Sequence, residues 1–98
     1  MDIASVHFKE RSLLAKIAAW KMGSNNAAMV IGKTIHLHNV SKEAFLENKR
    51  WLKHEMCHIE QYKKYGTLVF ITRYLLESIK KGYHNNRFEV EARIAEEL

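Results

Sequence analysis

Residues 51–66 read WLKHEMCHIEQYKKYG and centre on an HExxH segment that runs from His54 to His58. Apolar side chains surround this segment at helical spacing, which predicts a helix that is buried on most sides. In such a helix His54 and His58 lie one turn apart on one face and can bind the same metal ion. Glu55 lies about 100° around the helix, where its carboxylate can approach a metal-bound water without binding the metal itself.

An HExxH segment rarely arises by chance in a chain of this size. With six histidines among 98 residues, roughly 0.04 matches are expected at random. The alternative is a pair of surface histidines, but the apolar surroundings disfavour it because a buried imidazole needs a specific partner. Two neutral imidazoles suit Zn²⁺ and leave positions for a third ligand and a water.

The third ligand has to come from another part of the chain. After His58 the sequence reads IEQYKKYG, so the HExxHxxGxxH pattern is absent. The downstream candidates are Glu77, Glu89 and Glu91, and we expect Glu77 to form an ion pair with Lys80 or Lys81 in its own helix. Glu89 and Glu91 lie about 200° apart around a helix, so that one of them at most can face the metal site.

Four glycines and the absence of proline divide the rest of the chain into a few elements. We expect helices over about residues 9–22, 42–65, 68–81 and 86–98, and a β-hairpin of residues 27–31 and 34–38. Ser41 and Thr67 are expected to cap two of these helices, and apolar residues recur at helical spacing in the first and third. The sequence therefore predicts one α+β domain over residues 1–98, mostly helical, with a short hairpin before the HExxH helix.

The composition is that of a globular protein, with 47% hydrophobic and 28% charged residues. A single cysteine, Cys57, excludes an intramolecular disulfide, and the first residues carry no signal-peptide pattern. The longest apolar stretch is interrupted by Arg73 and is too short to cross a bilayer. We therefore expect a soluble protein of a reducing compartment, the cytoplasm, without a membrane partner.

The segments WLKHEMCHIEQYKKYG and GYHNNRFEVEAR (residues 82–93) resemble the small gluzincin zinc metallopeptidases of the minigluzincin type, with their HExxH…ExEA pattern. The resemblance extends to the hairpin VIGKTIHL (residues 30–37) and implies a minimal zincin-like fold with a C-terminal glutamate helix. It also implies one Zn²⁺ per chain, held by His54, His58 and Glu89, with Glu55 as general base. Several gluzincins have an acidic residue after the alanine of the ExEA unit, where this chain has Arg93.

The first functional hypothesis is therefore a zinc-dependent peptidase that acts on a peptide or protein substrate. The resemblance implies that the edge of the hairpin could pair with an extended substrate. Tyr83 and His84 could donate to an oxyanion, but we expect them to lie on a surface loop. The first alternative is a latent peptidase or a non-catalytic module that zinc stabilises.

The second alternative is a small basic helical protein that binds nucleic acid, since the net charge is +5. This alternative predicts binding that depends on salt and is indifferent to chelators. However, the basic residues are scattered along the chain, which is typical of a solvated surface. Nucleic acid is therefore not an expected partner.

Overall fold

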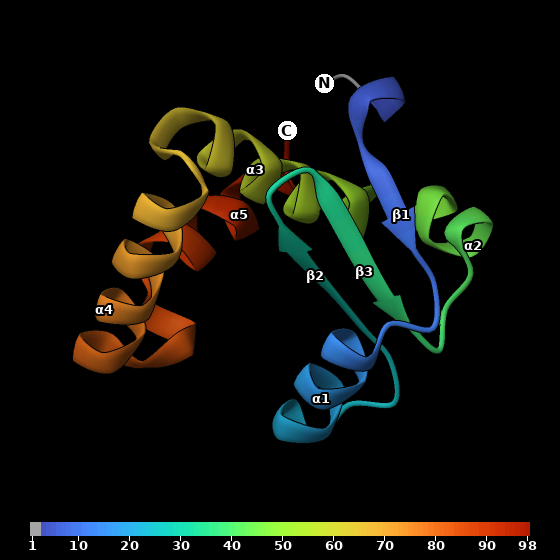
Figure 1. Cartoon of the computed structure of the whole chain (residues 1–98), viewed down its shortest axis with the longest axis horizontal. Coiled ribbons are helices and arrows are strands. Elements are labelled where there is room, and N and C mark those ends of the chain that lie inside the picture. Colours follow the sequence, from blue (N-terminus) through green and yellow to red (C-terminus); the bar gives the residue numbers. More distant parts are fainter. Residues whose placement is uncertain (1–2) are drawn as a thin grey trace.

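The computed structural model describes residues 3–98 and places a small three-stranded sheet between helices (Figure 1). The strands are β1 (His7–Lys9), β2 (Ala27–Ile31) and β3 (Thr34–His38), in the spatial order β1-β3-β2. Strand β1 runs parallel to β3, and β2 forms an antiparallel hairpin with β3 around the turn Gly32-Lys33. Gly32 takes the positive φ of 63° that the first position of such a turn requires.

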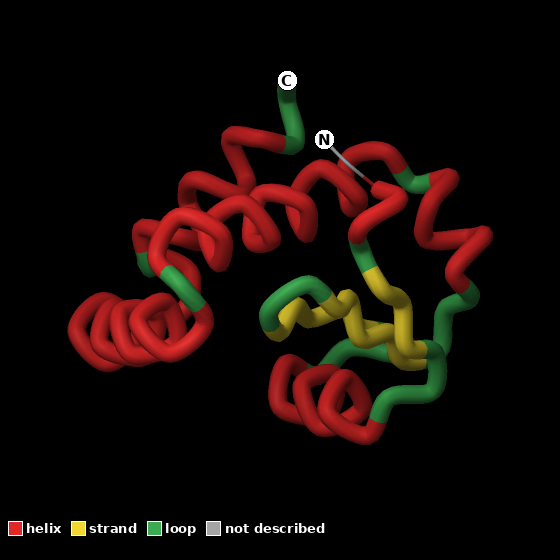
Figure 2. The backbone as a smooth tube through the Cα atoms, turned by 45° about the horizontal axis from the view of Figure 1, so that its top comes forward, coloured by secondary structure: helices red, strands yellow, loops and turns green. Residues whose placement is uncertain are grey.

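The helices surround the sheet on three sides. They are the 3₁₀-helix η1 (Ile3–Ser5), α1 (Leu13–Met22), α2 (Lys42–Glu47), α3 (Lys49–Tyr65), α4 (Thr67–Asn85) and α5 (Arg87–Ala95). The sheet lies between α1 and α3, and α5 runs beside α3 on the side away from the sheet (Figure 2). Helix α4 stands beyond β2, the edge strand of the hairpin (Figure 1).

The main hydrophobic core fills the space between the sheet and α3. Ile35 and Leu37 of β3 are fully buried there against Met56 and Ile59 of α3. Aromatic rings extend this core toward the other helices: Phe45 from α2, Phe70 from α4 and Phe88 from α5. The HExxH helix is therefore fixed on several sides, as the apolar surroundings of the motif predict.

The hairpin is confirmed residue for residue, but two expectations about the second helix and the N-terminal segment are wrong. The segment 42–65 is two helices, because Asn48 (φ −85°, ψ 90°) leaves the helical conformation and its side chain accepts a hydrogen bond from the Trp51 N–H. The first helix begins at Leu13 after the Ser12 cap, and residues 7–9 before it form β1. A three-residue strand carries too little periodicity to be recognised in a sequence.

The third helix also differs from the expectation at both ends. Its N-cap is Gly66, and Thr67 lies inside the helix without capping it. At the other end the chain kinks at Gly82 (φ 80°, ψ 165°) and then continues as a further turn to Asn85. Gly82 therefore interrupts the helix as expected, and the kink directs the next residues toward α5.

Helices α1 and α4 turn large apolar side chains outward. Helix α1 contacts the sheet through the small residues Ala15 and Ala19, while Trp20 remains 81% exposed. On α4, Leu68 and Ile79 are also 81% exposed. None of the helices that the structure describes combines the length and the apolar character that a bilayer crossing requires.

Candidate metal centre

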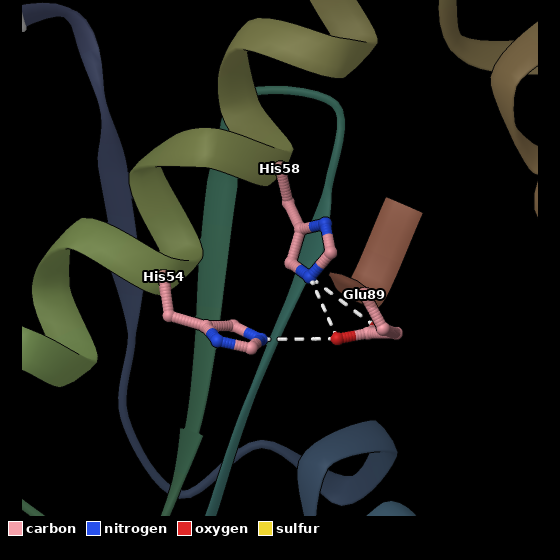
Figure 3. Close-up of side chains that lie close together, drawn as sticks. All are labelled: His54, His58 and Glu89. Carbon is pink, nitrogen blue, oxygen red and sulfur yellow. Dashed lines mark hydrogen bonds and ion pairs between the residues drawn. The ribbon is translucent and has the colours of Figure 1, made fainter. Parts of the chain in front are cut away.

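His54 and His58 of α3 converge on the carboxylate of Glu89 from α5 (Figure 3). His54 Nε2 lies 3.0 Å from Glu89 Oε1, and His58 Nε2 lies 3.3 Å from the same oxygen. The helical spacing of four residues aligns the two imidazoles, and the packing of α5 along α3 brings the carboxylate opposite them. One ligand atom from each of the three residues lies within 4.8 Å of the others.

The donor types and two of the three separations between donor atoms are compatible with Zn²⁺. Zinc takes imidazole nitrogen and carboxylate oxygen at about 2.0–2.2 Å in a tetrahedral arrangement, so neighbouring ligand atoms lie about 3.3 Å apart. The two nitrogen–oxygen distances, 3.0 and 3.3 Å, match this separation closely. Three protein ligands leave a fourth position open, which is the arrangement of catalytic rather than structural zinc sites.

The other ring nitrogen of each histidine has a partner that fixes the orientation of the ring. His54 Nδ1 lies 2.6 Å from Glu96 Oε2, and His58 Nδ1 lies 2.8 Å from Gln61 Oε1. Because both partners accept, each Nδ1 carries the proton and each Nε2 presents its lone pair toward Glu89 when the ring is neutral. Such partners stiffen a metal site and raise the basicity of its ligands.

Further hydrogen bonds hold the carboxylate and the amide in place. The Tyr74 hydroxyl of α4 donates to Glu89 Oε2 at 2.5 Å. The Gln61 amide donates to the carbonyl oxygen of Phe88 at 3.1 Å and to Glu91 Oε1 at 3.0 Å. Three helices therefore meet at the triad, and its geometry is set by contacts from each of them.

The partners of the triad favour charged imidazoles beside an ionised carboxylate. Burial alone would lower the pKa of His54, but hydrogen bonds to Glu89 and Glu96 and the charge of Glu55 raise it to about 9. The pKa of His58 is raised in the same way against its burial. Burial opposes ionisation of Glu89, yet hydrogen bonds from both histidines hold its pKa well below the usual range. A metal ion must therefore displace protons from the imidazoles.

Glu55 lies beside the triad, with its side chain in the wall of a cleft. It is 5% exposed, and its burial raises the pKa of the carboxyl group to about 7, against the charges of His58 and His54. A pKa near neutrality is suitable for a group that accepts and releases a proton. Its rotation off the ligand face agrees with the helical phase that separates it from His54.

The other downstream carboxylates point elsewhere. Glu91 is exposed and accepts a hydrogen bond from the Gln61 amide, and it is not among the three residues whose ligand atoms converge. Glu77 accepts from the backbone N–H of Arg87 at 3.1 Å and pairs with Lys81 at 3.5 Å, which confirms its intrahelical ion pair.

The remaining candidate residues lie around the site or away from it. Tyr83 is half-exposed and lines the cleft, whereas the exposed His84 is bound through its carbonyl oxygen to Arg93. Burial raises the pKa of Cys57 to about 11, which keeps this thiol protonated and unreactive.

Sequence reasoning missed three side chains of the site. Glu96 orients the His54 ring, and its place seven residues after Glu89, two helical turns along the same face, is a signal that could have found it. Gln61 could have been found in the same way, because a residue three positions after His58 lies on the same helix face. Tyr74 comes from a separate helix, and its sequence position gives no indication of its role.

The cleft beside the triad is a cavity of about 370 Å³ between β2, α1, α3 and α4. His54, Glu55, His58 and Glu89 all contribute to its wall. Comparisons of the chain with family models, with curated proteins and with solved structures find no match.

Proposed function

We propose that this protein is a zinc-dependent peptidase of the gluzincin type, with a zincin-like fold and one zinc ion per chain. The observation that carries the proposal is the convergence of two oriented imidazoles and one carboxylate at the wall of a cleft. Its zinc ligands are His54, His58 and Glu89. The cytoplasm, a reducing compartment, is part of the proposal, because the single cysteine cannot form an intramolecular disulfide.

Zinc, when bound, supplies Lewis acidity toward a scissile carbonyl and lowers the pKa of a water. Glu55 then acts as the general base, accepts the proton of the attacking water and passes it to the leaving amine. Its burial beside the cleft keeps this proton transfer away from bulk solvent. Glu96 and Gln61 keep the imidazoles turned toward the site, and Tyr74 holds the Glu89 carboxylate.

The edge of β2 gives an extended substrate a place to bind. In a two-residue hairpin the residues beside the turn exchange hydrogen bonds, so Ile31, Met29 and Ala27 bond to β3. The peptide groups of Ala28 and Val30 then point outward along the cleft. The outward carbonyl oxygen of Val30 already accepts a hydrogen bond from the Tyr62 hydroxyl at 2.9 Å. Ala28 thus remains next to the triad for pairing with a substrate backbone.

The test is the substitution Glu55→Gln, assayed with a broad peptide library. The amide keeps the shape of the side chain but cannot accept a proton, so zinc content and folding should persist while hydrolysis is lost. Hydrolysis that survives the substitution would overturn the assigned base. Zinc in both proteins with hydrolysis by neither would favour the non-catalytic, zinc-stabilised module instead.

A further inference from the structure

The cleft beside the triad has two halves of different character. A second cavity of about 580 Å³ adjoins the cavity of about 370 Å³, since His54, Glu55 and Tyr83 contribute to the walls of both. The first half extends toward α4 and the end of β2, and the second toward the start of α3 and the start of β2. If a bound peptide extends past the triad in both directions, its residues before and after the triad therefore lie in different surroundings.

The half toward α4 is apolar. Beyond the triad its walls come from Val30 and Ile31 of β2 and from Phe70, Ile71 and Leu75 of α4. Two of the three tyrosine hydroxyl groups in this wall are already engaged: Tyr62 donates to the Val30 carbonyl oxygen and Tyr74 to Glu89. A charged side chain placed here would lose its water without gaining a partner, whereas an apolar side chain gains from burial.

The half toward the start of α3 has a wall of mixed polar and apolar residues, in contrast to the apolar half. Asn26, Asn48 and Arg50 line it, and the Arg50 side chain is 61% exposed. The charge of Arg50 is already paired with Glu96 at 3.2 Å and Glu97 at 2.7 Å. Arg50 therefore has no unpaired charge with which to select an acidic side chain of a substrate. We expect the apolar half to determine which substrate side chains are preferred.

The direction of β2 assigns the apolar half to one side of the scissile bond. The strand runs from Ala27, in the half toward the start of α3, to Ile31, in the apolar half. Antiparallel pairing is the more stable arrangement. A peptide that pairs antiparallel with β2 has its N-terminal part beside Ile31 and its C-terminal part beside Ala27. Its residues on the N-terminal side of the scissile bond therefore lie in the apolar half.

We infer that this cleft selects peptides with a bulky apolar residue, such as Phe or Leu, on the N-terminal side of the scissile bond. This inference rests on the proposed function, since it places the scissile bond at the triad. A volume of about 370 Å³ lies within the ~300–1,000 Å³ range of small-ligand pockets, so one large side chain fits without rearrangement. The specificity-determining residues are Ile71 and Leu75 of α4.

The test uses two peptide hydroxamates, N-acetyl-Ala-Phe and N-acetyl-Ala-Lys hydroxamate, whose side chains precede the chelating group. Binding to the zinc-loaded protein is measured by calorimetry and does not depend on turnover. The Phe compound should bind at least tenfold more tightly. Leu75→Glu, which places a carboxylate in the apolar wall, should abolish or reverse this preference.

Leu76→Glu is the matched control, because Leu76 is exposed to 50% against 55% for Leu75 and does not line the cavity. It should leave the preference unchanged. Equal affinities for the two hydroxamates, or no binding of either to protein that contains zinc, would overturn the inference while the metal site stands. In a benzylsuccinyl hydroxamate the side chain follows the chelating group. If this compound bound more tightly than N-acetyl-Ala-Phe hydroxamate, the assigned direction of the substrate along β2 would be overturned. Protein without zinc would overturn the proposed function itself.

Discussion

Replacing Glu96 with alanine should weaken zinc binding although Glu96 does not touch the metal position. Its carboxylate lies 2.6 Å from His54 Nδ1, and its side chain is 21% exposed. The substitution frees the imidazole to rotate and lowers its basicity toward zinc. Loss of such a partner typically costs 10–100-fold in metal affinity, which corresponds to about 1.4–2.8 kcal/mol of binding free energy.

Glu97→Ala is the control for this experiment. Glu97 shares Arg50 as a partner with Glu96 but makes no contact with His54, and its side chain is 64% exposed. Zinc affinity of both variants is measured by competition with a chromogenic chelator at constant pH, and folding by circular dichroism. Glu97→Ala should change the affinity less than about twofold. Equal effects of the two substitutions, or an unchanged affinity in a folded Glu96→Ala protein, would refute the orienting role.

Two further predictions concern the metal-free protein. Tyr74→Phe removes the hydroxyl that donates to Glu89 at 2.5 Å and should lower the free energy of unfolding in urea by about 1.5–3 kcal/mol; Tyr65→Phe, which removes an exposed contact with Arg87, should change it little, and equal losses would contradict the account. Folding raises the pKa of His54 from 6.5 to about 9 and the pKa of Glu55 from 4.5 to about 7. The protonated forms therefore favour the folded state, and their contribution to the free energy of unfolding is complete at a pH below the pKa of the unfolded chain. This contribution is lost as the pH rises through the pKa of the folded protein. Because the pKa of Glu89 is lowered, its contribution is lost on acidification. The metal-free protein should therefore be more stable near pH 5.5 than at pH 9, and urea titrations showing the reverse order would contradict these assignments.

The parts of the site that follow from local geometry could be predicted from the sequence. The positions of His54, Glu55 and His58 relative to one another depend on helical periodicity alone. Helical phase also showed that one of Glu89 and Glu91 could face the site, and the resemblance to gluzincins indicated Glu89. The structure brings Glu89 to the histidines and directs Glu91 toward Gln61.

The parts that depend on tertiary contacts could not be predicted in the same way. Tyr74 reaches Glu89 because α4 is placed against α5, which no sequence spacing determines. The apolar residues of α1 and α4 follow helical spacing, yet Trp20 and Leu68 are exposed. Periodicity finds an apolar face but does not state which elements cover it. The break at Asn48 was missed because the apolar pattern continues through it, although asparagine is a favoured cap.

The zinc content of freshly purified, unchelated protein tests the central claim most directly. Elemental analysis should find close to one zinc per chain in the unsubstituted protein and in Glu91→Gln, and a large loss in Glu89→Gln, because two imidazoles without the carboxylate hold the ion weakly. Glu91→Gln is the matched control, since Glu91 lies two residues away on the same helix and outside the triad, and the new amide oxygen can still accept the hydrogen bond from Gln61. Protein without zinc, or zinc that survives Glu89→Gln and is lost in Glu91→Gln, would contradict the assignment of this site.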